Sequence, residues 1–238
     1  MSSEGADVSA IELSLGDKQL IMTVNTRVVA KFGLLSIQVD RVRAGHHLAE
    51  EALGRHDDRV EEWYKANLKR DPGDAEFITY LYKEQKADAA QGYPQLLRSA
   101  LFATGYGVFE FFMTTLCKEL EEHTVGPRLK DLRGEGIRRA SLYLTKVARI
   151  DFPDSDEWQR LLLYGLLRNA LVHSQGDLSA NQDLPAIKQL QAREGTFEFE
   201  SRDSAVVLGP AFTPRFLDTV TGFAETLDRK LESYIIVP

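Results

Sequence analysis

The sequence predicts a mainly α-helical protein with a small β-hairpin near its C-terminus. Apolar residues recur at three- and four-residue intervals over most of the 238-residue chain, which is the period of an amphipathic helix. Near the C-terminus the period changes to two, as in a short pair of strands. Neither an internal repeat nor a Pro- or Ser-rich linker interrupts the pattern. We therefore expect one domain rather than two.

The N-terminal part is expected to be a weakly ordered segment followed by a long helix. Residues 1–20 show no persistent period and are predicted to be a flexible or edge segment, so the single helical domain covers residues 21–238. A helical pattern runs from Thr23 to Arg70, although glycines inside it suggest bends or a break. A turn with Pro and Gly follows, and the helical pattern then continues to Lys86 and pauses at residues 92–94.

The strongest amphipathic helix is predicted at residues 96–122. It ends before Gly126 and Pro127, and a further helix is expected to close near Ala148. An aromatic stripe at helical spacing lies on the first of these helices, and such a stripe is more typical of a protein core than of a ligand site. Its members are Phe102, Tyr106, Phe109 and Met113.

The next helix carries the apolar segment LLLYGLLRNALVH and is expected to start at Asp154 or Ser155 and to stop at Gly176. Residues 196–208 then alternate apolar and polar side chains around a polar turn, which predicts the hairpin. Thr213 followed by Pro214 is expected to open the last helix, so that the hairpin and C-terminal helix together cover residues 196–236.

Composition favours an ordinary soluble protein. Hydrophobic residues make up 43% and charged residues 27% of the chain, and an uncharged apolar run long enough to cross a membrane is absent. The first residues lack the basic start and apolar centre of a signal peptide. A single cysteine, Cys117, excludes an intrachain disulfide and a multi-cysteine zinc site. We therefore expect a cytoplasmic protein with no membrane partner.

The charge distribution shows a basic segment in an acidic protein. The net charge of −7 argues against a general nucleic-acid coat. Residues 126–149, however, hold seven basic and two acidic side chains and carry +5. This segment could contact a polyanion locally, although a solvated helix face is the more common explanation of such a pattern. The candidate RNA contacts are Lys130, Arg133, Arg138 and Arg139.

Several familiar sites are missing or weak. The chain has no P-loop, no G-x-S-x-G and no H-E-x-x-H motif. His46, His47 and Glu50 could share a helix face and bind a metal, but the paired E-x-x-H motifs of di-metal bundles are absent. We interpret these three residues as a solvated face and Cys117 as a small core residue. Neither a metal nor a cofactor is expected.

Three polar residues remain unexplained inside the apolar segment. Asn169 and His173 are four residues apart and share one helix face, with Arg168 beside them. This set suits cleavage of an RNA phosphodiester, because the 2′-hydroxyl supplies the nucleophile and a metal is not required. Histidine can exchange the proton, arginine can neutralise the phosphorane oxygens, and Asn169 can orient His173 or hydrogen-bond the phosphate.

A purely structural interpretation stays open at this point. Arg168 could bridge to Glu110 or another carboxylate, and His173 could pack in the core. For an isolated R-x-x-x-x-H spacing this interpretation is favoured, because two residues at one spacing often occur together by chance.

The residues from Arg168 to His173, R-N-A-L-V-H, resemble the R-x(4–6)-H signature of the HEPN superfamily. Two preceding segments are also similar to its larger prokaryotic branch. Residues 96–120 resemble the aromatic-rich helix, with Glu110 at the acidic position, and residues 129–147 resemble the segment that links it to the motif helix. The resemblance covers roughly residues 92–182.

The resemblance implies a helical bundle that forms a homodimer and brings two Arg/His motifs into one cleft. It implies a metal-independent endoribonuclease of a toxin–antitoxin or antiviral defence system, with RNA as substrate and a cognate antitoxin or other defence protein as partner. Arg168 and His173 would then be catalytic, Asn169 would support them and Glu110 would hold the arginine. Some members lack nuclease activity, so a non-catalytic module that binds nucleotide, RNA or a protein partner is the alternative.

Overall fold

The computed structural model describes residues 15–173, 177–178, 181–200 and 205–235. Its fold is mainly α-helical with one two-stranded antiparallel hairpin, which confirms the predicted fold class. The α-helices are α1 (Leu15–Arg70), α2 (Ala75–Ala87), α3 (Tyr93–Glu121), α4 (Gly136–Lys146), α5 (Asp156–His173), α6 (Leu184–Glu194) and α7 (Phe212–Ile235), and the strands are β1 (Phe197–Glu200) and β2 (Ala205–Leu208).

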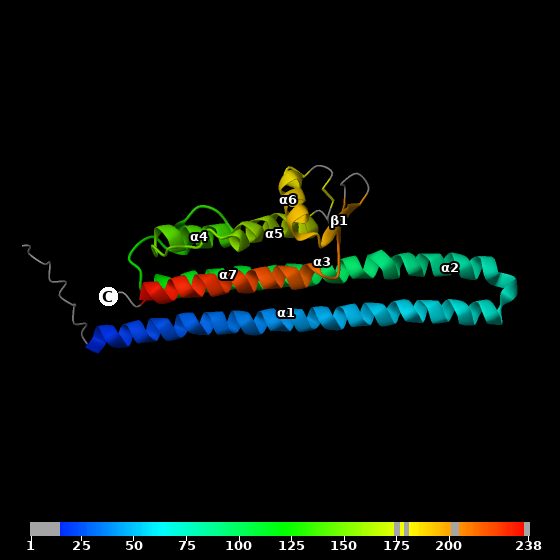
Figure 1. Cartoon of the computed structure of the whole chain (residues 1–238), viewed down its shortest axis with the longest axis horizontal. Helices are drawn as coiled ribbons and strands as arrows, with labels where there is room; N and C mark the ends of the chain where they lie inside the picture. Colours follow the sequence, from blue (N-terminus) through cyan, green and yellow to red (C-terminus); the bar gives the residue numbers. More distant parts are fainter. Residues whose placement is uncertain (1–14, 174–176, 179–180, 201–204, 236–238) are drawn as a thin grey trace, which may run out of the picture.

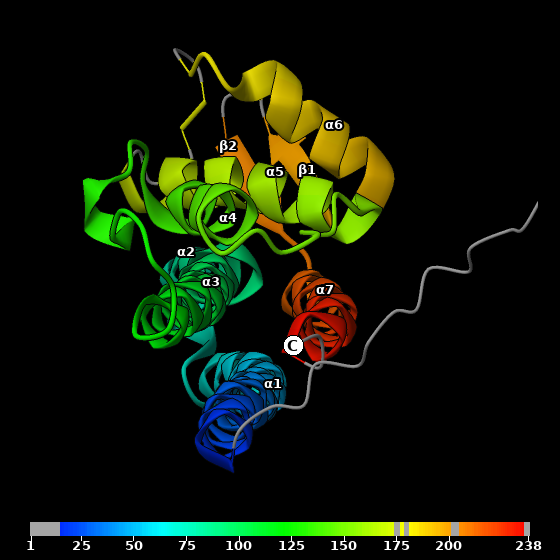
Figure 2. The same cartoon turned by 90° about the vertical axis from the view of Figure 1, so that its left-hand side faces the viewer.

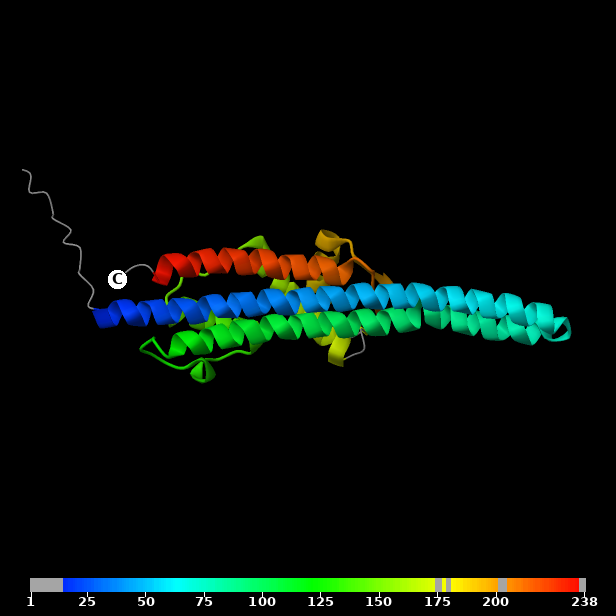
Figure 3. The ribbon, with the colours of Figure 1, turned by 90° about the horizontal axis from the view of Figure 1, so that it is seen from below.

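Three long helices form the base of the molecule. α1 runs the length of the structure and packs against both α3 and α7 (Figures 1 and 3). Viewed along the bundle, the three helices occupy the corners of a triangle (Figure 2). The helices come close together at Gly105, because a Cβ there would lie 3.2 Å from Phe216, 3.3 Å from Leu217 and 3.5 Å from Val42. A larger residue at position 105 would push the three helices apart.

A second layer covers α3 and α7 on the side away from α1 (Figure 2). α4 packs against α3, α5 packs against both α3 and α7, and α6 lies on α5. The hairpin pairs Phe197 with Leu208 and Glu200 with Ala205. The Gln95 side chain of α3 bonds the Val206 carbonyl at 2.7 Å and the Leu208 amide at 2.9 Å, which fixes β2 to α3.

The end of α1 and the helix α2 form a two-helix arm that extends beyond the start of α7 (Figure 1). Tyr64 and Tyr82 stack with their ring centroids 4.2 Å apart, and the Tyr82 hydroxyl donates to Glu61 at 2.6 Å. Lys86 pairs with Asp57 at 2.6 Å and with Glu61 at 3.0 Å. Mixed polar and aromatic contacts hold this arm together, in contrast to the apolar interior of the bundle.

Several boundaries differ from the expectations. α1 starts at Leu15 and continues through its glycines without a break, while residues 1–14 of the expected segment 1–20 lie outside the described residues. The pause at residues 92–94 is a π-helical turn, Asp88–Gly92, that joins α2 to α3. α6 had no counterpart in the sequence prediction. Its first turn holds a proline, and Gly195 ends it in the left-handed conformation.

The expected cap of the last helix is wrong. α7 already starts at Phe212, where the backbone amide donates to the Gly209 carbonyl at 3.1 Å. The Thr213 hydroxyl is buried and makes no hydrogen bond within the described residues, so it does not cap the helix. The hairpin leads directly into the helix, and the backbone of this connection supplies the bond that a capping side chain would otherwise make.

The stretch Pro72–Glu121 is long and apolar enough, by length and composition alone, to cross a membrane. No membrane span was expected, because an uncharged apolar run of about 18 residues is absent from the sequence. Its apolar residues include Phe102, Phe109 and Met113, which are fully buried in the bundle. This is the pattern of a core helix, which passes the same test of length and composition.

Candidate functional site

α5 positions the motif residues at its C-terminal end. The helix starts as predicted, because the Ser155 hydroxyl accepts a hydrogen bond from the Trp158 amide at 3.3 Å. Trp158, Leu161, Tyr164 and Leu167 are buried and hold the helix against α3 and α7. The expected stop at Gly176 lies outside the described residues, and α5 ends at His173.

A pocket of about 330 Å³ opens between α3, α5 and the start of α4. All three motif residues line it, together with Glu110, which is the remaining residue proposed from the resemblance. The helical spacing already placed these three side chains on neighbouring positions of one face, and the fold adds Glu110 of α3 and the start of α4 around them. The complete lining is Tyr106, Glu110, Glu135, Gly136, Ile137, Arg138, Leu162, Gly165, Leu166, Arg168, Asn169 and His173.

Arg168 has no carboxylate partner within 4 Å among the described residues. Its Nη1 donates to the Asn169 Oδ1 at 3.0 Å, while its Nε is buried and makes no hydrogen bond in the described part of the chain. The expected ion pair with Glu110 is not formed, although Glu110 lines the same pocket. A partly buried guanidinium without a counter-ion is costly, and an anionic ligand would relieve that cost.

Asn169 and His173 are exposed at the mouth of the pocket. The Asn169 side chain accepts a hydrogen bond from Arg168, a partner that differs from the two expected for it, which were His173 and the phosphate. His173 is in the last turn of α5 and is accessible to a ligand or to another chain. His173 is therefore not packed in the core, as the structural interpretation of the motif would have required.

Two glycines make room for polar side chains from α3. A Cβ at Gly165 would lie 2.4 Å from the Tyr106 hydroxyl oxygen, and a Cβ at Gly136 would lie 2.4 Å from Glu110 Oε1. Real Cβ atoms do not approach so closely, so each glycine allows a hydroxyl or a carboxylate to reach the pocket. Gly136 also has a φ of +52°, a conformation that favours glycine.

The basic segment, residues 126–149, contributes one of its basic side chains to the pocket. Arg138 lines it, whereas Lys130 and Arg133 are exposed outside its lining. Arg139 donates from Nε to the Gly134 carbonyl at 2.7 Å and is likewise outside. The pocket therefore combines the cations Arg138 and Arg168 with the carboxylates Glu110 and Glu135.

His46 and Glu50 do not form a solvated face, contrary to expectation. His46 is buried, and Glu50 receives two hydrogen bonds of 2.7 Å from Arg98, whose Nη1 also donates to the Leu208 carbonyl at 3.0 Å. Burial lowers the pKa of His46. Only His47 is exposed. The helix face carrying His46 is covered because α3 and the hairpin connection pack onto it, which the periodicity of α1 alone did not indicate.

Cys117 is a core residue, as predicted. It is fully buried, its Sγ lies 3.5 Å from the Ala140 carbonyl oxygen, and burial raises the pKa of its thiol. A thiol in this state is a poor nucleophile and a poor metal ligand.

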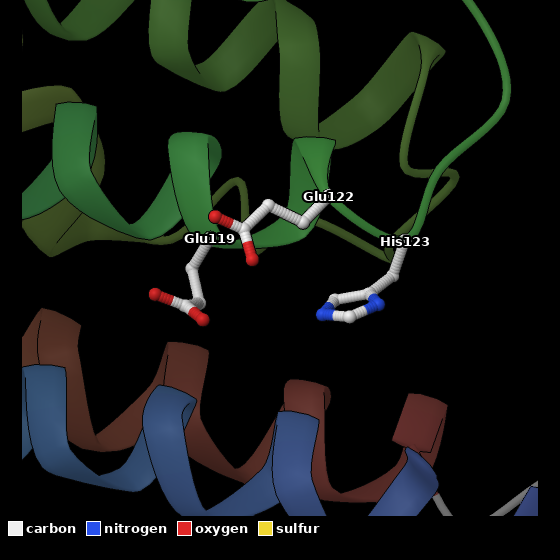
Figure 4. Close-up of side chains that lie close together, drawn as sticks. All are labelled: Glu119, Glu122 and His123. Atoms are coloured by element: carbon white, nitrogen blue, oxygen red, sulfur yellow. The ribbon is translucent and has the colours of Figure 1, made fainter.

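One further cluster has the composition of a cation site. Glu119, Glu122 and His123 place one ligand atom each within 4.8 Å of the others at the end of α3 (Figure 4). Arg27 of α1 already pairs with Glu119 at 3.3 Å and Glu122 at 2.9 Å, and Lys31 pairs with Glu119 at 3.3 Å. A metal would have to displace these cations, so we interpret the cluster as a link between α1 and α3.

Sequence reasoning missed Tyr106 as a pocket residue. It was assigned to the aromatic core stripe, and its ring does pack between Phe102 and Phe216. Its hydroxyl, however, belongs to the pocket. A signal was present in the sequence: Gly165 sits in the middle of an apolar helix, where glycine costs about 1 kcal/mol relative to alanine and therefore suggests a close approach.

Comparisons of this chain with protein-family models, with curated proteins and with solved structures give no significant match.

Proposed function

We propose that this chain is a metal-independent endoribonuclease of the HEPN type that acts as a homodimer. The observation that carries the proposal is the convergence of Arg168, Asn169 and His173 on one pocket in which Arg168 has no carboxylate partner among the described residues. A structural arginine would be expected to carry a counter-ion at this depth. An RNA phosphate is a ligand of the right charge to replace it.

The reaction would be an intramolecular transfer within the RNA. The ribose 2′-oxygen attacks the adjacent phosphorus while its proton passes to an imidazole, and the bond from phosphorus to the 5′-oxygen breaks. The leaving 5′-oxygen takes a proton, which yields a 2′,3′-cyclic phosphate and a 5′-hydroxyl. Arg168 would neutralise the charge that develops on the phosphorane oxygens.

A second copy of the chain would supply the second imidazole that this reaction requires. One imidazole accepts the 2′-hydroxyl proton and another donates to the leaving oxygen, but each pocket contains a single histidine. His173 is exposed at the end of α5, where the partner subunit's His173 can share the same cleft. Light scattering at micromolar concentration should therefore give a dimer, and a protein that stays monomeric contradicts a composite cleft.

The direct test compares wild type with Arg168→Ala and His173→Ala on a mixed-sequence RNA in EDTA. We expect wild type to produce 2′,3′-cyclic phosphate ends and both variants to lose about a hundredfold or more of the cleavage rate. His123→Ala is the matched control, because His123 is exposed far from the pocket and should retain full activity. Equal cleavage by all four proteins, or cleavage that stops in EDTA, refutes the assignment.

A biological role as a toxin or antiviral effector can be tested separately. Induced expression of wild type should arrest growth of the host cell, and expression of Arg168→Ala at the same level should not. A partner protein that restores growth to wild type would be the expected antitoxin. Arrest by both proteins would show that the effect does not depend on the pocket.

A non-catalytic module that binds nucleotide, RNA or a protein partner is the second candidate. It is favoured by the net charge of −7 and by the two carboxylates, Glu110 and Glu135, that line the pocket beside the arginines. Such a lining attracts a polyanion less than a purely basic cleft would. Binding of RNA without cleavage, unchanged by His173→Ala, would favour this candidate.

A further inference from the structure

Tyr106 is a polar residue of the pocket to which the proposed reaction assigns no role. It is 7% exposed, and its ring is fixed within the aromatic core by Phe102 and Phe216. The hydroxyl lies at the pocket and makes no hydrogen bond within the described part of the chain. A nearly buried hydroxyl normally has a partner, so this one is available for a ligand.

The surroundings of the hydroxyl indicate what that ligand is. Tyr106 interacts electrostatically with Arg168 and Arg138, two cations that line the same pocket, and with Glu110. Burial, and then the Glu110 carboxylate, raise the pKa of Tyr106, so the phenol keeps its proton at neutral pH. A neutral phenol that shares a pocket with two guanidinium groups is suited to donate a hydrogen bond to an anionic oxygen that those groups attract.

The chain also preserves space for this hydroxyl. Gly165 lies on α5 one turn before Arg168, and a Cβ at this position would overlap the Tyr106 oxygen at 2.4 Å. The tyrosine ring cannot rotate away easily, because it is packed against two other aromatic rings. The missing side chain at position 165 therefore keeps the hydroxyl directly beneath the helix turn that presents Arg168.

We propose that Tyr106 is a phosphate-binding residue whose hydroxyl donates a hydrogen bond to the RNA phosphate held by Arg168 and Arg138. This inference rests on the proposed function, since it assumes RNA in the pocket. It adds a contact from α3 that the R-x-x-x-x-H motif of α5 does not contain. The bound phosphate would then be fixed from two helices rather than one.

The experiment compares Tyr106→Phe with Tyr164→Phe. Both tyrosines are buried, and burial raises the pKa of both, but Tyr164 does not line the pocket. The probe is a short mixed-sequence single-stranded RNA with 2′-fluoro groups, which cannot undergo 2′-hydroxyl attack. Binding is measured by fluorescence anisotropy, and thermal unfolding of each variant by circular dichroism.

We expect Tyr106→Phe to weaken binding of the 2′-fluoro RNA about tenfold, the effect of losing one hydrogen bond to a charged group. Tyr164→Phe should bind like wild type. The same loss should appear in kcat/KM on unmodified RNA. Equal binding by wild type and Tyr106→Phe, equal losses in both tyrosine variants, or no binding by wild type overturns the inference.

The failure of this inference is distinguishable from failure of the proposed function. If Arg168→Ala abolishes cleavage while Tyr106→Phe binds and cleaves normally, the nuclease assignment stands and only the role of Tyr106 is wrong. If wild type binds the 2′-fluoro RNA through Tyr106 but cleaves no RNA, the nuclease assignment is wrong and the phosphate contact stands.

Discussion

The two halves of α5 each contain an arginine, and the two arginines differ in their partners. Arg160, in the first half, pairs with Asp156 at 3.0 Å, with Glu157 at 3.7 Å and with the fully buried carboxylate of Glu194 at 3.1 Å. Arg168, eight residues later, has the Asn169 amide oxygen as its hydrogen-bond acceptor and no carboxylate partner among the residues that the structure describes. Both arginines are partly buried, and removing a guanidinium group from water costs free energy. Carboxylates of the protein offset this cost for Arg160, whereas no carboxylate among the described residues offsets it for Arg168.

This difference distinguishes an arginine that links helices from the arginine that we propose binds a substrate. Arg160 links α5 to α6 through Glu194, and Arg215 of α7 joins the same carboxylate at 2.9 Å. The charges of this network are paired with one another, so none is available for a ligand. The second half of α5 instead exposes its polar groups to a pocket, which is the arrangement expected where stability has been sacrificed for binding.

The largest expected effect is on activity at Arg168. Arg168→Met keeps the apolar stem and removes the charge, so cleavage of RNA should fall by about 10³-fold. The free energy of unfolding should change by less than about 1 kcal/mol, because no ion pair is lost. Cleavage assays and urea unfolding measure the two quantities. A large loss of stability with little loss of cleavage would show that Arg168, like Arg160, has a structural role.

Arg160→Met tests the other half of the helix. It leaves Glu194 buried with Arg215 as its remaining partner, and breaking a buried ion network costs about 3 kcal/mol. Urea unfolding should show this loss, while the native protein that remains should bind RNA like wild type. Normal stability in this variant would show that the network contributes little.

Gly165→Ala tests how tightly the pocket is built. The added methyl group overlaps the Tyr106 hydroxyl, so we expect a loss of about 2 kcal/mol in the free energy of unfolding. In the Tyr106→Phe background the oxygen is gone, but the ring carbon that carried it would still lie 3.2 Å from the added Cβ, so the substitution should cost less than in wild type without becoming stabilising. A double-mutant cycle by urea unfolding gives the coupling. Additive effects would mean that the two groups do not touch.

His46 gives a pH dependence that is unrelated to the pocket. Burial lowers its pKa in the folded state, whereas Glu50 raises it and Arg98 and His47 lower it further. The unfolded chain therefore binds more protons once the pH falls below about 6.5, and stability is lost there by no more than about 1.4 kcal/mol per pH unit.

Urea unfolding of His46→Gln and His47→Gln above and below a pH of about 6.5 checks whether His46 causes this acid sensitivity. The first variant should lose part of the acid sensitivity of wild type, and the second should retain it, because His47 is exposed. The same acid sensitivity in both variants would place the effect on another group.

The smallest effect is expected for Gly107→Ala on α3. A Cβ at Gly107 meets nothing within 4 Å, so alanine should stabilise the helix by about 0.5–1 kcal/mol. Gly105→Ala is the matched substitution two residues away and should destabilise instead, since its Cβ approaches Phe216 and Leu217. Thermal unfolding of both variants distinguishes them, and equal shifts would contradict the packing described at Gly105.

The sequence by itself determined the long helices, the hairpin and the residues of the motif, but not α6. Apolar periodicity is a local property, so it located α3, α5 and α7 and identified Phe102 and Phe109 as core. The polar trio was recognised because charged and amide groups are costly inside an apolar helix. These inferences require only the helical repeat and the chemistry of each side chain.

Only the tertiary structure decided which groups share a space. It buried His46 and paired Glu50 with Arg98, left Arg168 without a counter-ion in the described part of the chain, and placed the Tyr106 hydroxyl close to Gly165 at the pocket. These outcomes depend on how helices distant in sequence pack against one another. The period of a single helix shows which residues share a face, but it does not show what covers that face.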